Sequence, residues 1–148
     1  MPNRKTRKFE VSHTEHTVAK PHQIWALWSN VNHWPKWDLG LKATELKHEF
    51  AVGSKFKLLP QGAEQAITSE IKAIEPNKKF ADITQLPFGT IEAVHELEEV
   101  GGKTKVTHRI VALIDEDQAD MFSKQVWKNI EKGLSGSVKK LTELAEKS

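Results

Sequence analysis

Short segments rich in β-branched and aromatic residues, each closed by glycine, proline or asparagine, divide the chain between residues 41 and 114, and this regular division most constrains the fold. Segments of this length and spacing predict antiparallel strands joined by tight turns rather than strand–helix–strand units. Gly101-Gly102, between two alternating runs, is typical of a hairpin turn. The expected strands cover 41–50, 53–60, 65–75, 78–86, 88–99 and 103–114.

A strand and two short helices are expected before this series. Residues 9–20 are rich in β-branched residues and lack a helical apolar stripe, so they predict a strand. Pro21 suits the first turn of a helix, because its missing N–H needs no partner there. Asn30 or Asn32 is a suitable cap for a second short helix, which Pro35 interrupts.

The period of the apolar pattern changes after the last expected strand. From Glu116 onward apolar residues recur at every third or fourth position, which predicts one long amphipathic helix. Gly133 and Gly136 interrupt it, and they indicate either a place where something must fit beside the helix or close packing on the sheet. A sheet of seven antiparallel strands tends to curl, and this helix is expected to cover its concave side.

Composition narrows the class of protein. A chain of 148 residues fits one domain. The absence of cysteine excludes disulfides and thiolate metal sites. A protein without disulfides is compatible with the reducing cytoplasm, which is the expected location. No apolar run approaches the roughly 20 residues that span a bilayer. Much of the positive charge behind the net charge of +2 lies in residues 1–8, which are expected to be a disordered basic tail. The rest of the chain is close to neutral, and this argues against a nucleic-acid-binding surface. The charged residues of that tail are Arg4, Lys5, Arg7 and Lys8.

Several motifs along the chain resemble the START-like, or helix-grip, superfamily, specifically its polyketide cyclase/dehydratase and lipid transport branch. They are EVSHTEHTVAKPHQIWALWSNVNHWPKWD (10–38), VGSKFKL (52–58), GGKTKVTHRI (101–110) and GLSGSVKKLTELAE (133–146). The resemblance implies an α+β fold: a curved seven-stranded antiparallel sheet, two short helices after the first strand, and a long C-terminal helix across the concave face. It implies a single START-like ligand-binding domain over 9–148 and no shared catalytic motif.

Four of the five tryptophans lie between residues 25 and 37. In a helix-grip fold Trp25 and Trp28 would sit on a helix that supports the sheet, while Trp34 and Trp37 would flank a tight turn. Packing is the expected role of these side chains, because large aromatic groups bury much apolar area. Trp34 is the exception, since its loop is expected near a cavity mouth, where it would contact a ligand.

Strand alternation places four ionisable residues among inward positions: His13, Glu15, His95 and His108. The resemblance implies that the first, sixth and seventh strands are neighbours, so these side chains could converge. They would then either supply a general base, with Glu15, His13 and His108 as catalytic candidates, or orient a polar group of a ligand. A one-residue bulge would instead turn them toward water. No metal-ligand spacing or phosphate-binding loop occurs, so we expect no metal and no cofactor.

The leading interpretation is a module that binds a small, largely apolar molecule, such as a lipid or polyketide-like compound, between sheet and C-terminal helix. One alternative is an enzyme of the cyclase/dehydratase type, and another is a protein-interaction module. We expect no nucleic-acid partner, no transmembrane segment, and a monomer or homodimer. The expected ligand-binding residues are Trp34, Phe56, Leu58, Ser69, Ile71, His95, Ile110, Phe122, Ile130 and Leu134.

Overall fold

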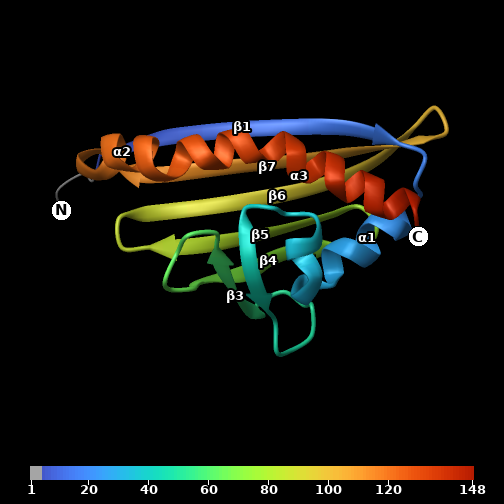
Figure 1. The fold of residues 1–148 in the computed structure, drawn as a ribbon, viewed down its shortest axis with the longest axis horizontal. Coiled ribbons are helices and arrows are strands. Elements are labelled where there is room, and N and C mark those ends of the chain that lie inside the picture. The colour runs from blue at the N-terminus through green and yellow to red at the C-terminus, as the bar shows by residue number, and fades with distance from the viewer. Residues whose placement is uncertain (1–4) are drawn as a thin grey trace.

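The computed structural model describes residues 5–148 (Figure 1). It consists of a curled antiparallel sheet packed against a long C-terminal helix. The strand order is β1-β7-β6-β5-β4-β3-β2, so the first strand pairs with the last. This α+β helix-grip fold confirms the predicted fold class. The strands are β1 (Thr6–Thr17), β2 (Leu41–Glu45), β3 (Lys55–Pro60), β4 (Ile67–Glu75), β5 (Lys79–Leu86), β6 (Gly89–Val100) and β7 (Lys103–Asp115).

The helices lie on one side of the sheet. Two short ones, α1 (Pro21–Ser29) and the 3-10 helix η1 (Val31–Lys36), follow β1 as predicted. The C-terminal helix runs along β1 and β7 in Figure 1, where the sequence predicted one long amphipathic helix. Instead, five residues form a π-helical segment in its first half, which adds residues to one turn and shifts the face that meets the sheet. Its parts are α2 (Glu116–Phe122), η2 (Ser123–Trp127) and α3 (Lys128–Glu146).

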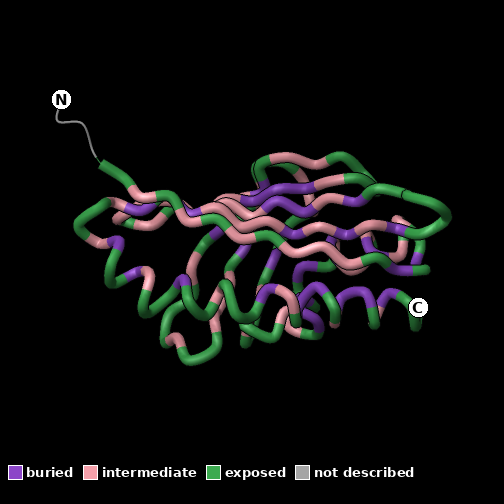
Figure 2. Tube along the Cα trace, turned by 90° about the horizontal axis from the view of Figure 1, so that it is seen from above, coloured by how far each residue is buried: buried purple, intermediate pink, exposed green. Residues whose placement is uncertain are grey.

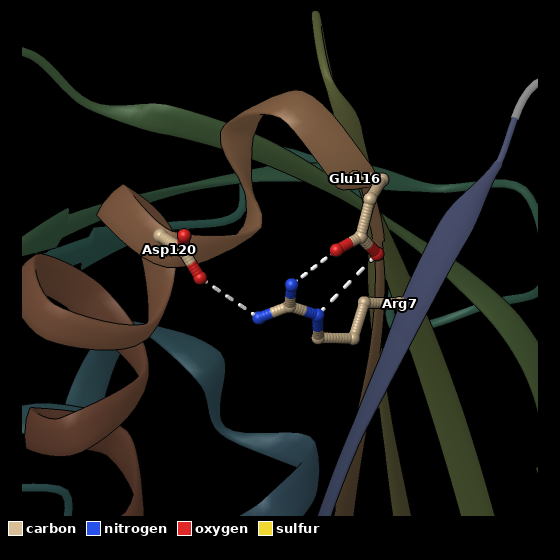
Figure 3. A network of polar contacts seen from close by, with 3 residues as sticks. All are labelled: Arg7, Glu116 and Asp120. Atoms are coloured by element: carbon tan, nitrogen blue, oxygen red, sulfur yellow. Dashed lines mark hydrogen bonds and ion pairs between the residues drawn. The ribbon is translucent and has the colours of Figure 1, made fainter.

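The prediction of a disordered basic tail over residues 1–8 is wrong for residues 6–8, which belong to a strand. β1 begins at Thr6, because its end pairs with the last residues of β7. The Arg7 guanidinium bonds the carboxylates of Glu116 and Asp120 on α2 (Figure 3), which raises the pKa of Arg7 through these hydrogen bonds. The Glu116 N–H also donates to the Lys5 carbonyl at 2.9 Å. The remaining tail residues, including Arg4, lie outside the described residues.

The buried residues form two clusters along the length of the sheet. One surrounds Trp28 where α1 and η1 cover the sheet, and the other surrounds Phe122 where α2 and η2 cover it. Figure 2 shows buried positions on both the sheet and the C-terminal helix. Ile110 and Val11 contact both clusters and are themselves only partly buried. The middle of the concave face is therefore less completely covered than its two ends.

The two glycines of α3 do not make room for a neighbour. Gly133 and Gly136 are not in close contact with any other element: a Cβ added at either position would meet no atom within 4 Å. Both expectations for these glycines are therefore wrong, because the two residues lie on the helix face that points away from the sheet.

Replacing both glycines by alanine is expected to stabilise the protein. Alanine favours the helix by about 1 kcal/mol per site relative to glycine, and neither methyl group would clash. Urea unfolding of Gly133→Ala, Gly136→Ala and the double variant measures this gain. Gly89→Ala is the matched control: its Cβ would lie 2.1 Å from the Leu113 carbonyl oxygen, so this variant should lose stability. A double variant no more stable than the wild type would contradict the prediction.

Candidate functional site

A row of rings crosses the concave face of the sheet at one level. Phe80, His95, His108 and His13 stand directly opposite one another on β5, β6, β7 and β1. Directly paired residues on antiparallel strands point to the same side of a sheet. The rings of Phe80 and His95 stack with centroids 3.9 Å apart, and those of His95 and His108 are 4.6 Å apart.

The structure brings all four ionisable candidates of the sequence analysis to this level. His13 Nε2 contacts Glu15 Oε2 on β1, and their side chains are 27% and 25% exposed. His95 and His108 are buried in the core. The group thus has an accessible part on the edge strand and a buried part on the central strands.

The indole of Trp28 connects α1 to the buried part of this row. Its Nε1–H donates to Nε2 of His108 at 3.1 Å, which requires that nitrogen to be unprotonated. Burial lowers the pKa of His108 well below its usual value and lowers that of His95 to about 3. Both imidazoles are therefore neutral, and the Nε2 lone pair of His108 is already engaged.

Trp34 lies in the core rather than at a cavity mouth. It is 4% exposed, its Nε1–H donates to the Trp28 carbonyl at 2.9 Å, and its ring packs on Phe56 with centroids 5.3 Å apart. The expected location at an opening is wrong, because η1 folds this loop back under α1. Trp37 is also buried, but its Nε1–H has no hydrogen-bond partner within residues 5–148.

The other expected ligand-binding residues are divided between the two core clusters. Ser69 is buried on the concave face, where its hydroxyl shares a 2.5 Å hydrogen bond with that of Thr84. Ile110 contacts both clusters. The Trp28 cluster holds Phe56, Leu58, Ile71 and Leu134, and the Phe122 cluster holds Phe122 and Ile130.

One carboxyl group that the sequence analysis did not select, that of Asp82, is buried on the concave face. Asp82 lies two residues after Phe80 on β5 and is 5% exposed, and its side chain makes no hydrogen bond within the described part of the chain. Burial, together with the charges of Glu92 and Asp38, raises its pKa to about 8. The alternation Phe80, Asp82, Thr84 in the sequence was a sufficient signal for its inward position.

Asp38 follows η1 and reaches the C-terminal helix. Its Oδ1 accepts hydrogen bonds from the Ser137 hydroxyl at 3.4 Å and from the Gly40 N–H at 3.2 Å. Burial raises the pKa of Asp38 despite these two bonds. No sequence pattern indicated this position, because it depends on where the loop after Trp37 meets α3.

Apolar side chains beside Asp82 on the concave face keep part of their surface exposed. Val11, Ile91, Ala93 and Ile110 face the C-terminal helix but are only partly buried. Two pockets lie around β3. One of about 290 Å³ is lined by Glu45, Lys47, His48, Lys55, Phe56, Lys57 and Thr68, and one of about 260 Å³ by Lys55, Thr68, Ser69, Glu70, Ile83 and Gln85.

The described residues provide neither a cluster for a metal ion nor a helix suited to cross a membrane. Over residues 5–148, no group of three or more histidine, cysteine, aspartate or glutamate side chains is placed to hold a metal ion. Within the same residues, no helix is long and apolar enough to cross a membrane.

The buried carboxyl of Asp82 predicts a distinctive pH dependence of stability. Its pKa is raised from 3.8 to about 8, so between these values the folded protein binds more protons than the unfolded chain. The stabilisation that the raised pKa of Asp82 gives to the folded protein is fully present below pH 3.8, the pKa in the unfolded chain. It is lost as the pH rises toward 8, by up to about 1.4 kcal/mol per pH unit. The buried histidines act in the opposite direction below about pH 6.5, because their pKa values are lowered.

Comparison with Asp82→Asn isolates the carboxyl from the histidines. We expect the wild type to lose stability relative to this variant as pH rises from about 5 to about 8, measured by urea unfolding. Glu10→Gln removes an exposed carboxylate from β1, and this control should keep the wild-type dependence. Parallel curves for the wild type and Asp82→Asn would show that Asp82 is ionised in the folded protein.

Comparison with known proteins places this geometry in a family. Several solved structures share the fold at low sequence identity. Truncated norcoclaurine synthase from Thalictrum flavum has a TM-score of 0.76 at 9% identity, over 100% of this chain and 99% of that one. TTHA0849 from Thermus thermophilus has 0.74 at 14%, over 94% and 98%. The di-domain ARO/CYC StfQ of the steffimycin biosynthetic pathway has 0.77 at 11%, over 95% of this chain and 51% of that one.

Sequence comparison narrows the assignment further. No curated protein matches the chain at a significant level. The family profile described as Activator of Hsp90 ATPase homolog 1-like protein matches residues 18–146, which is most of the chain. The predicted START-like superfamily is confirmed, and within it the chain belongs to the Activator of Hsp90 ATPase homolog 1-like protein family.

Proposed function

We propose that this protein binds a small, largely apolar molecule between the concave face of the sheet and the C-terminal helix. The observation that carries the proposal is the incomplete cover of the middle of the sheet. Val11, Ile91, Ala93 and Ile110 are apolar, face the helix, and still keep exposed surface between two fully packed clusters.

Burial of this apolar surface supplies the driving force for binding. Each square ångström of apolar surface removed from water contributes about 25 cal/mol. A molecule seated against Ala93 and Ile110 would also lie beside Asp82, which is their neighbour across the strands. A few polar groups on an apolar wall are typical of sites that orient small molecules.

A bulky side chain at the centre of the face is expected to block binding. Ala93 lies directly between Asp82 and Ile110 in the strand register, so Ala93→Phe would occupy the proposed site. We expect n-octanol to shift the NMR signals of Val11, Ile91 and Ile110 in the wild type and to leave them unchanged in this variant. Circular dichroism would verify that the variant folds, since added core volume commonly costs about 1–3 kcal/mol.

Ser12→Phe is the matched control, because Ser12 is exposed on the opposite face of β1. This variant should bind n-octanol as the wild type does. If n-octanol shifts only signals around the β3 pockets, or none, the proposed site is wrong. Native mass spectrometry of the purified protein would complement the titration by identifying any apolar compound that copurifies.

Contact between His13 and Glu15 favours a second candidate, an acid–base enzyme. The two side chains are partly exposed beside the interior, as a general base must be to reach a substrate. We expect the wild type to accelerate deuterium exchange at the α-carbon of ethyl acetoacetate, with Glu15→Gln losing this effect and Glu10→Gln retaining it. Equal rates for all three proteins would exclude this role.

A protein-interaction role stays a prediction of the sequence analysis. It is supported by the description of the family, which names activation of the Hsp90 ATPase.

A further inference from the structure

We propose that the side chain of Asp82 donates a hydrogen bond to a carbonyl oxygen of the bound molecule, so that the ligand is an uncharged, largely apolar carbonyl compound. This inference rests on the proposed function and names the polar group that the apolar site would recognise. It concerns one residue of β5, on the level of the sheet next to the histidine row.

Asp82 is the one polar residue in an otherwise apolar row across the concave face. The strand register places it directly between Ile71 on β4 and Ala93 on β6, and Ile110 and Val11 continue the row on β7 and β1. Directly opposed residues point to the same side of a sheet, so all of these side chains face the interior. Ala93, Ile110 and Val11 are only partly buried, so a molecule seated on them would have Asp82 at its side.

Among the buried polar and charged residues of the described chain, Asp82 alone makes no side-chain hydrogen bond. The hydroxyls of Ser69 and Thr84 bond each other at 2.5 Å, and His108 accepts a hydrogen bond from Trp28. The other buried polar side chains that have a partner are those of Thr17, His95, Thr104, Ser137 and Thr142. A buried polar group normally has a hydrogen-bond partner, so this exception requires an explanation.

The carboxyl of Asp82 borders space that another molecule can enter. The residue keeps 5% of its surface exposed. Its oxygens are not among the side-chain atoms of residues 5–148 that are both fully enclosed and without a hydrogen-bond partner, whereas Nε1 of Trp37 is. Because the Asp82 oxygens have no partner, they must retain accessible surface. A partner for this carboxyl can therefore come from outside the chain.

The protonation state of the carboxyl favours an acceptor as that partner. Burial, together with the charges of Glu92 and Asp38, raises the pKa of Asp82 to about 8, so at neutral pH the group carries a proton that it can donate. A carbonyl oxygen accepts this hydrogen bond without bringing a charge or a donor that would need a partner of its own. A carboxylate ligand is disfavoured, because the buried residues of the described chain include no lysine or arginine to neutralise it.

Other titratable groups face the same interior, so the test must separate them from Asp82. On the sheet these groups are His13, Glu15, His95 and His108. The buried positions of the helices from α1 to α3 hold no titratable side chain within the described residues. Comparison with variants of Asp82 isolates its carboxyl, because all other groups are common to the proteins compared.

Titration with 2-heptanone and 1-chloroheptane separates the carbonyl oxygen from the apolar chain, because the two molecules have the same number of non-hydrogen atoms. NMR signals of Ile71, Ala93 and Ile110 would report binding to the full protein at neutral pH. Asp82→Leu replaces the carboxyl by an apolar group of similar size. We expect the ratio of the two affinities to favour the ketone about tenfold more in the wild type than in this variant. Glu10→Leu, on the outer face of β1, should keep the wild-type ratio.

The dependence on pH distinguishes a donor from a merely structural role of Asp82. In the wild type the affinity for 2-heptanone should fall about tenfold between about pH 7 and about pH 9, as the carboxyl loses its proton. Asp82→Asn keeps an N–H donor and cannot ionise, so this variant should bind the ketone with an affinity independent of pH.

The possible outcomes distinguish this inference from the proposed function. If n-octanol binds but the affinity ratio is the same in the wild type and Asp82→Leu, the carbonyl contact is wrong and the apolar site stands. A wild-type ketone affinity that is independent of pH would also overturn the inference. Tighter binding of n-heptylamine than of 2-heptanone would do the same, because Asp82 would then act as a carboxylate. If neither n-octanol nor 2-heptanone shifts the concave-face signals, both proposals fail.

Discussion

The contact between Trp28 and His108 joins the two layers of this protein. The indole N–H of Trp28 on α1 donates to a ring nitrogen of His108 at the centre of β7, and both side chains are buried. Around them pack the rings of Phe80, His95 and Trp37. A buried indole N–H without an acceptor costs free energy, so this bond favours one placement of α1 on the sheet.

Beyond this packed end, the apolar residues in the middle of the concave face are only partly buried. The histidines are satisfied and neutral, whereas Asp82 is buried without a hydrogen bond among the described residues and lies beside partly exposed apolar side chains. Such a carboxyl makes the fold less stable at neutral pH than an apolar residue would. Local violations of this kind are commonly found where a protein interacts with other molecules.

Sequence reasoning located the strands and helices well and the site only in part. Turn residues and alternation fix strands locally, so the hairpin at Gly101-Gly102 and the inward histidines were predictable. The start of β1 and the π-helical segment were missed, because the first depends on pairing with β7 and the second on how Trp127 meets the sheet. Asp82 was within reach of the same alternation, whereas Asp38 was not.

The sequence by itself determined the order of elements, the curled sheet and the inward faces of its strands, because turn chemistry and hydrophobic period act over a few residues. Tertiary structure alone decided that Trp34 lies in the core, that the pair His13 and Glu15 lies beside His108, and that Asp38 meets Ser137. These contacts join residues far apart in the chain, and their geometry depends on how the helices settle on the sheet.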